Sequence, residues 1–181
     1  MSRIGCIGWG SLVWRPKNLP VLGSGWRSDG PALSIEFARQ SKFDRVTLVL
    51  CKNVPPVQTF WTELEAHTLD EAAEALRKRE GTGKRRIGRW PGDASPPAAT
   101  IGPWAEGHGL AGVVWTALPP KWNGKDDRFP DEDVLSYLRG LKRWGRSCAE
   151  TYVRRAPASI RTPYRAAIEA ELGWLPQESC P

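Results

Sequence analysis

One segment of this chain carries signals for both ends of a helix. Thr68-Leu-Asp-Glu71 is a capping box: the threonine hydroxyl accepts from the backbone amide of Glu71, and the glutamate side chain reaches back to the threonine amide. Gly81 stands just after the last turn, where left-handed backbone is common. The sequence therefore predicts a helix that begins after Thr68 and ends at Gly81.

Short apolar runs typical of strands stand on both sides of this helix, at 3–7, 33–38, 45–51, 57–64 and 112–118. Helical patterns follow at 131–144, 147–155 and 162–173. This order favours an α+β fold with a mixed or barrel-like sheet. The segment 82–109 is rich in Gly, Pro and Ala and is predicted to be a long loop, such as a lid.

The length of 181 residues predicts a single domain, in which the helical residues 126–181 form a C-terminal extension packed on the rest. The chain lacks both an apolar run of about 18 residues and a signal-peptide pattern, so we expect a cytoplasmic protein without a membrane partner. Its four cysteines and two histidines lack metal-ligand spacing, so we expect neither a metal site nor a disulfide framework. The oligomeric state has no signal in the sequence.

The stretch Gly8-Trp-Gly-Ser-Leu12 directly follows the first predicted strand. Glycines at a strand end permit positive φ and let a ligand approach the backbone. Successive amides in such a turn can point together at an anion, so a carboxylate or a phosphate would fit. The stretch matches neither the phosphate-loop nor the dinucleotide-binding pattern, so it does not indicate a nucleotide. The alternative is a tight turn without a ligand.

Glu80 is the candidate catalytic carboxylate. Leu69, Ala72, Ala73 and Leu76 define the apolar face of the predicted helix, and Glu80 returns to that face eleven residues after Leu69. An inward carboxylate is costly unless it is paired or used, and the helix dipole disfavours a negative charge at this end. Such an environment suits a general acid or base.

Other readings of the carboxylates stay open. Glu80 could simply form an ion pair with an arginine such as Arg39 or Arg45, or fray at the helix end. Glu36 and Glu63 lie on predicted strands and are reserve candidates. Strand alternation turns Glu36 toward solvent, so Glu63 is the better of the two.

The opening stretch and the helix end together resemble the γ-glutamylcyclotransferase-like proteins, with the ChaC-type branch closest. Gly8-Trp-Gly-Ser-Leu-Val-Trp-Arg-Pro16 is similar to the YGSL loop of that family, with Trp9 where the family usually has Tyr. Leu76-Arg-Lys-Arg-Glu-Gly81 is similar to the helix end at which the family's catalytic glutamate stands. The order of loop, strands, helix and glutamate agrees over about residues 3–118.

The resemblance implies a small mixed β-barrel with flanking helices. In that family the loop amides hold the α-carboxylate of a γ-glutamyl group, and the glutamate moves protons while the substrate's own α-amine attacks its γ-carbonyl. The products are 5-oxoproline and a free amine or peptide. Carried over to this chain, Glu80 would be catalytic, and Trp9, Gly10, Ser11 and Leu12 would bind a small-molecule γ-glutamyl substrate, without a cofactor or metal.

Two other functions stay open at this stage. An enzyme of the same fold could use Glu80 on a different substrate, with the basic residues 84–86 and Arg89 binding an acidic part of it. A non-catalytic module could instead bind nucleic acid or a protein through residues 77–79, 84–86 and Trp90, which the net charge of +6 permits. Nucleic-acid binding of this kind would weaken steeply with salt.

Overall fold

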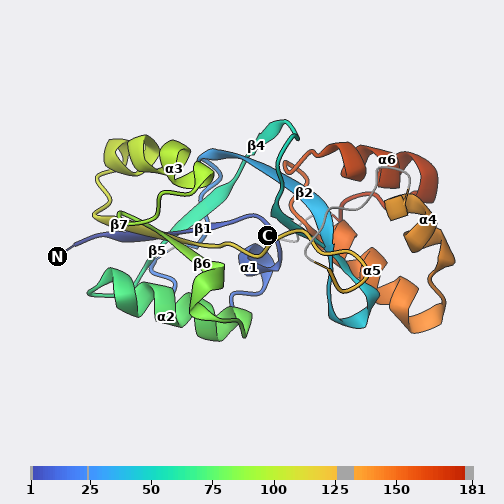
Figure 1. The fold of residues 1–181 in the computed structure, drawn as a ribbon, viewed down its shortest axis with the longest axis horizontal. Coiled ribbons are helices and arrows are strands. Elements are labelled where there is room, and N and C mark those ends of the chain that lie inside the picture. The colour runs from blue at the N-terminus through green and yellow to red at the C-terminus, as the bar shows by residue number, and fades with distance from the viewer. Residues whose placement is uncertain (1, 24, 126–132, 178–181) are drawn as a thin grey trace. The chain divides into compact units, whose positions relative to one another are not determined.

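The computed structural model describes residues 2–23, 25–125 and 133–177. Contacts between residues divide the chain into two compact units, each described by itself below (Figure 1). Unit 1 consists of Met1–Leu33 and Gln58–Leu118, and unit 2 consists of Ser34–Val57 and Pro119–Pro181. The protein is α+β, as its sequence predicts.

Unit 1 is built on a mixed four-stranded sheet. Its strand order is β5 (Phe60–Leu64), β1 (Ile4–Gly8), β7 (Gly112–Thr116) and β6 (Ile87–Trp90). β1 runs antiparallel to β5 and parallel to β7, and β6 runs antiparallel to β7. Every residue of β1 is buried, as expected for a central strand covered on both faces.

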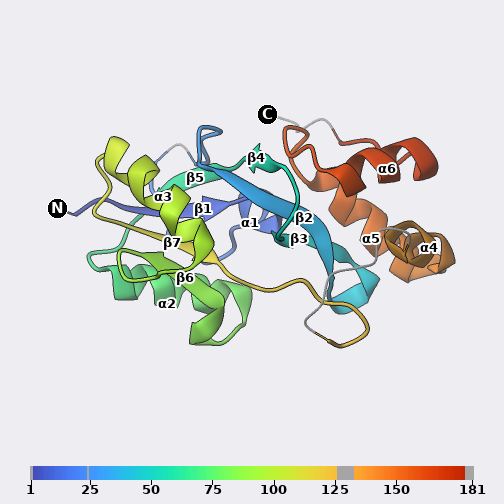
Figure 2. The same ribbon diagram turned by 45° about the horizontal axis from the view of Figure 1, so that its top comes forward.

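Two helices cover the opposite faces of this sheet, α2 (Leu69–Glu80) and α3 (Pro96–Gly107) (Figures 1 and 2). The predicted caps of α2 are confirmed. The Thr68 hydroxyl accepts from the Glu71 amide, the capping box is complete, and Gly81 has a φ of 62°. Burial of Ala72 and Leu76 among the apolar side chains of β1 and β7 fixes the helix on the sheet.

The prediction of a long loop over 82–109 is wrong. This segment contains the short 3-10 helix η2 (Lys84–Arg86), strand β6 and helix α3. Pro96 stands in the first turn of α3, where a proline costs no hydrogen bond. The buried residues Ala98, Ile101, Gly102 and Ala105 follow helical spacing, a signal hidden by the Gly and Pro content.

Unit 2 contains most of a three-stranded sheet with the order β3 (Val46–Leu50), β2 (Ala32–Gln40) and β4 (Pro56–Gln58). The short 3-10 helix η1 (Lys42–Asp44) connects β2 to β3. Within the described residues, three C-terminal helices are observed as predicted: α4 (Asp133–Gly140), α5 (Arg143–Arg155) and α6 (Pro163–Leu172). The predicted boundary between the first two, after residue 144, is wrong, because α4 ends at Gly140 and α5 already begins at Arg143. Asp131, the predicted start of the first of them, lies outside the described residues.

The predicted closed barrel is not formed. The strands of the described residues make two open sheets, of four and three strands. Strand patterns in a sequence show that a segment is extended but not which neighbour it pairs with, and closure depends on that pairing. Across the described ranges, every helix falls short of the length and apolar character needed to cross a membrane.

Candidate active site

Glu80, the last residue of α2, turns inward as the helical spacing predicts. Its side chain is 14% exposed. Its Oε1 atom accepts a hydrogen bond from the Thr116 hydroxyl at 3.3 Å, and Thr116 is the last residue of β7. The same Oε1 accepts from Nη1 of Arg79 at 2.6 Å. Among the described residues Glu80 has no further hydrogen bond, so its Oε2 atom is not engaged.

Arg79 connects this carboxylate to the loop after β1. Its side chain is only 5% exposed. Nη2 donates to the Ser11 hydroxyl at 3.3 Å and to the Arg15 carbonyl at 2.7 Å. The buried Nε atom has no acceptor within the described part of the chain. The ion pair of Glu80 with an arginine, which the sequence offered as the alternative to a catalytic role, is therefore observed. Its partner is the adjacent Arg79, so the guess of Arg39 or Arg45 is wrong.

The glycines of the loop after β1 do not have the positive φ values that the sequence analysis expected. Neither Gly8 nor Gly10 has a positive φ, and Gly10 precedes a single helical turn, α1 (Ser11–Trp14). A Cβ atom on Gly8 would lie 2.6 Å from the ring of Trp26. Gly8 is thus needed for close packing against a tryptophan that sequence reasoning did not single out.

Of the four predicted substrate-binding residues, Ser11 brings its side chain to the Glu80 cluster. Its hydroxyl is the one that Arg79 contacts. The side chains of Trp9 and Leu12 are buried, and Leu12 belongs to the apolar core of unit 1. Gly10 contributes backbone alone, and its carbonyl accepts from the Val13 amide at 2.9 Å. The loop is therefore anchored by its apolar side chains and meets α2 through a serine.

Cys6 lies beneath this cluster on β1 and is fully buried. Burial raises the pKa of its thiol well above the usual range, the Glu80 charge raises it further, and the Arg79 charge opposes both. The thiol therefore stays protonated at neutral pH, and a protonated thiol is a poor nucleophile. Glu80 is left as the group in this cluster that can exchange a proton.

Taken together, the geometry suits proton transfer at one carboxylate oxygen. Oε1 is fixed by two donors, while Oε2 is left without a partner among the described residues. A general acid or base needs a fixed position and one oxygen that can reach the substrate. Thr116, Arg79 and Ser11 come from three separate segments. In the sequence, Arg79 is one of the basic residues 77–79 with no role assigned beside Glu80, and no motif singles out Thr116.

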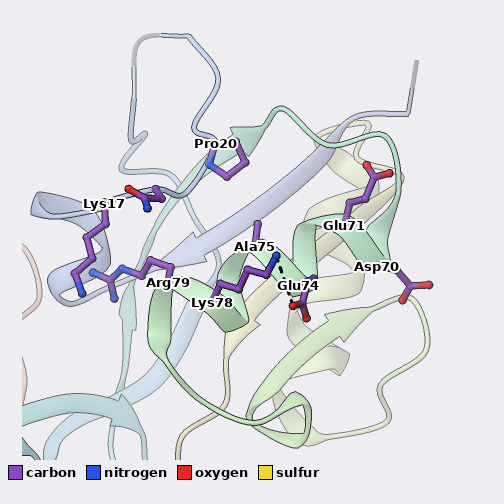
Figure 3. Close-up of a pocket in the computed structure, with 9 residues that line it drawn as sticks. Lys17, Pro20, Asp70, Glu71, Glu74, Ala75, Lys78 and Arg79 are labelled. Atoms are coloured by element: carbon purple, nitrogen blue, oxygen red, sulfur yellow. Dashed lines mark ion pairs between the residues drawn. The ribbon is translucent and has the colours of Figure 1, made fainter.

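A groove of about 700 Å³ runs beside the cluster, along the outer side of α2 (Figure 3). Arg79 and Lys17 lie toward one end, and Asp70 and Glu71 lie toward the other. Between them, Glu74 and Lys78 form an ion pair at 3.9 Å. Glu80 is not among the lining residues, so Arg79 is the side chain that the groove and the cluster share.

The reserve carboxylates have structural partners. Glu63 accepts from Arg3 at 2.6 Å and from Arg27 at 3.4 Å. Its hydrogen bond to Arg3 lowers the pKa of the Glu63 carboxyl, and the Arg3 and Arg27 charges add to that effect. Glu63 is therefore held by two arginines with both of its carboxylate oxygens engaged, and neither oxygen is left to reach a substrate.

The prediction that Glu36 faces solvent is wrong, because this residue is completely buried. Its carboxylate accepts from the Phe37 amide at 2.7 Å, from the Tyr164 amide at 3.1 Å and from the Thr162 hydroxyl. Thr162 caps α6, so the start of that helix covers the strand face that alternation had assigned to solvent. A covered face buries the polar positions of a strand as well as the apolar ones.

Within the described residues, no three His, Cys, Asp or Glu side chains gather as they would around a metal ion. Comparisons with models of known protein families, with curated proteins and with solved structures found no match. The fold and the site define the class as an α+β protein with a mixed sheet and a partly buried Glu–Arg pair at a helix end.

Proposed function

We propose that this protein is a γ-glutamylcyclotransferase-like enzyme that cleaves a γ-glutamyl amide and releases 5-oxoproline. One observation carries the proposal. The glutamate at the end of α2 and the serine of the Gly-Trp-Gly-Ser loop, the two features on which the resemblance rests, are joined through a single side chain, Arg79. Residues 69 positions apart in the chain, Ser11 and Glu80, thus belong to one cluster.

In the proposed reaction the α-amine of the substrate attacks its own γ-carbonyl carbon. A C–N bond forms and closes the five-membered ring, and the original amide C–N bond breaks. Glu80 accepts the proton lost by the attacking amine and delivers it to the leaving amine. The atoms therefore balance without water or a cofactor, and the attack gains from being intramolecular.

The other residues of the cluster position Glu80. Thr116 and Arg79 fix Oε1, so that Oε2 is the oxygen that moves the proton. Arg79 also fixes the loop through Ser11 and the Arg15 carbonyl. In the family that this chain resembles, the corresponding loop holds the substrate's α-carboxylate. The positive charge of Arg79 is itself suited to attract an anionic substrate.

The test is release of 5-oxoproline from a panel of γ-glutamyl peptides and γ-glutamyl amines, measured with the purified wild-type chain and with Glu80→Gln. We expect release from at least one substrate and a loss of about 100-fold or more in the variant, the range for a removed general acid or base. The amide is close in size to the carboxylate, so the cluster should keep its packing.

The matched control is Glu74→Gln, six residues earlier on the same helix, where the carboxylate is 39% exposed and pairs with Arg77. This variant should release 5-oxoproline at the wild-type rate. No release from any member of the panel would contradict the proposal and favour a different substrate. Equal loss in both variants would show that Glu80 has no special role.

A further inference from the structure

Two large aromatic side chains lie exposed next to each other on unit 2. Phe43 on η1 is 53% exposed, and Trp144 at the start of α5 is 62% exposed. Their ring centroids are 5.0 Å apart, in an edge-to-face arrangement. Leaving two such rings in water has a cost, and exposed aromatic clusters are common where a protein binds a partner.

The backbone that presents these rings is strained. Phe43, Asp44 and Arg143 have φ values of 64°, 58° and 43°, in the left-handed region that side chains other than glycine rarely adopt. Strain of this kind persists where the surrounding structure enforces it, and it concentrates at functional sites.

The support beneath the rings is tightly packed. A Cβ atom on Gly145 would meet the Asp44 side chain, including its Cβ at 3.3 Å, so glycine at this position lets η1 lie close against the first turn of α5. The Asp44 carbonyl also accepts from the Tyr137 hydroxyl at 3.1 Å. The aromatic pair is therefore held by two helices and is not carried on a free loop tip.

The charge around the rings is positive on balance, because four basic residues (Lys42, Arg45, Lys142 and Arg143) stand against the single carboxylate of Asp44 among the described residues of η1 and the start of α5. Lys42, Lys142 and Arg143 are exposed and have no ion pair within the described part of the chain. The Arg45 guanidinium lies 5.6 Å from the centroid of the Phe43 ring. A second copy of this surface would face it with like charges, so the charges call for an anionic partner.

The basic segment 77–90 of unit 1 contains the residues that the sequence suggested for nucleic-acid binding. It differs from the aromatic surface of unit 2 in how its arginines are paired. Arg77 pairs with Glu74 at 2.7 Å, Arg79 with Glu80 at 2.6 Å, and Arg89 with Asp70 at 2.6 Å. These internal pairs already neutralise most of its arginines. The aromatic surface of unit 2 therefore has more positive charge available for an anion than the segment that motif reading selected.

We propose that unit 2 binds single-stranded nucleic acid through this surface, which we name the Trp144 patch and define by Lys42, Phe43, Arg45, Lys142, Arg143 and Trp144. Trp144 is the more exposed ring and supplies the platform on which a base stacks, while Arg45 and Phe43 support it from the side. Lys42, Lys142 and Arg143 contact phosphates. The carboxylates that make a peptide acidic offer no flat surface for the indole face, whereas every nucleotide joins a flat base to a phosphate. Two rings alone bury little area in a membrane.

The test uses the full chain and a fluorescein-labelled oligothymidylate of about 12 nucleotides, followed by fluorescence anisotropy. We expect binding that weakens with salt between about 50 and 200 mM, with a log–log slope near −2 for three phosphate contacts. Trp144→Ala and Trp144→Leu should each weaken binding at least about fivefold, and Trp144→Tyr should restore most of it. Loss in Trp144→Leu separates stacking from simple apolar contact.

Two charge variants complete the test. Lys142→Gln combined with Arg143→Gln should lower the magnitude of the salt slope by about 1.4, from about 0.7 for each phosphate contact. The matched control, Lys84→Gln combined with Arg85→Gln in unit 1, should leave both affinity and slope unchanged. Circular dichroism of each variant verifies its fold.

Three outcomes would overturn the proposal. The first is no binding of the oligonucleotide at the lowest salt concentration, and the second is equal loss in the unit 1 control. The third is equally tight, Trp144-dependent binding of poly-glutamate or of vesicles of equimolar phosphatidylserine and phosphatidylcholine, which would assign the patch to an acidic protein or a lipid surface. The 5-oxoproline assay is independent of all three.

Discussion

Nη1 of Arg79 donates to Oε1 of Glu80 at 2.6 Å, although the two residues are neighbours in the chain. Consecutive side chains on a helix point about 100° apart, so adjacent residues seldom meet. Here Glu80 is the last helical residue, and the backbone turns left-handed immediately afterwards at Gly81. The guanidinium also reaches the loop after β1, so a single side chain holds both parts of the candidate site.

Replacing Arg79 with lysine should destabilise unit 1. Lysine keeps the charge, but its single nitrogen lacks the fork of an arginine that reaches Glu80, Ser11 and the Arg15 carbonyl together, so at least one of these acceptors loses its donor. We expect the free energy of unfolding to fall by about 1–3 kcal/mol in urea titrations. Arg77→Lys, at a more exposed pair, should lose clearly less than Arg79→Lys. Equal losses would mean that Arg79 does not connect the two segments.

Gly8→Ala should destabilise the protein through Trp26. The new Cβ would lie 2.6 Å from the ring, so the ring or β1 must move. We expect a loss of about 1–3 kcal/mol, as for other overpacked sites, measured by chemical unfolding. Gly83→Ala is the matched control, because a Cβ there meets nothing within 4 Å and the φ of −82° suits alanine. That variant should be neutral or more stable by about 0.4–1 kcal/mol, and the reverse ranking would refute the packing role of Gly8.

The Glu63–Arg3 pair should make the stability of unit 1 sensitive to acid. Because Arg3 lowers the pKa of Glu63 in the folded state, the unfolded chain takes up this proton at higher pH. The contribution is therefore present above the ordinary carboxyl pKa and is lost as the pH falls through the lowered one.

Urea unfolding at pH 6 and about pH 3 should show that Glu63→Gln loses less stability on acidification than the wild type, by up to about 1 kcal/mol. Arg3→Gln should show most of this flattening, because only Arg27 is left to lower the pKa of Glu63, and the double variant should match Glu63→Gln. Additive effects of the two substitutions would mean that the residues titrate independently.

Glu36→Gln should destabilise unit 2. The carboxylate accepts from two backbone amides and from the Thr162 hydroxyl in a fully buried position, whereas the glutamine NH2 group would face a donor. We expect a loss of about 2–4 kcal/mol in chemical unfolding. Glu150→Gln, which removes a partly exposed pair with Arg154, should cost less than about 1 kcal/mol. A Glu36 variant as stable as this control would refute the capping of α6 by a strand residue.

Some parts of this protein follow from the sequence because their signals are local. The ends of α2 are marked by Thr68, Glu71 and Gly81, which act on backbone groups within one turn. The inward direction of Glu80 follows from the fixed rotation per residue of a helix. Thr162 and Gly173 mark α6 in the same way.

Other parts depend on which segments pack together, and no local pattern carries that information. In the sequence Arg79 is one of several basic residues in a row. Its role depends on the loop after β1, whose Arg15 carbonyl it contacts in the folded chain. Strand alternation alone assigns Glu36 to the solvent face. In the folded chain the start of α6 covers that face, and the Tyr164 amide donates to the Glu36 carboxylate. In the sequence Trp144 is one of ten tryptophans with nothing to distinguish it. Only the fold places Phe43 of η1 beside it. The sequence determined the caps and the helix faces through interactions within a few residues. Tertiary packing decided the partners, because the free energy of a buried charge or an exposed ring depends on neighbours distant in the chain.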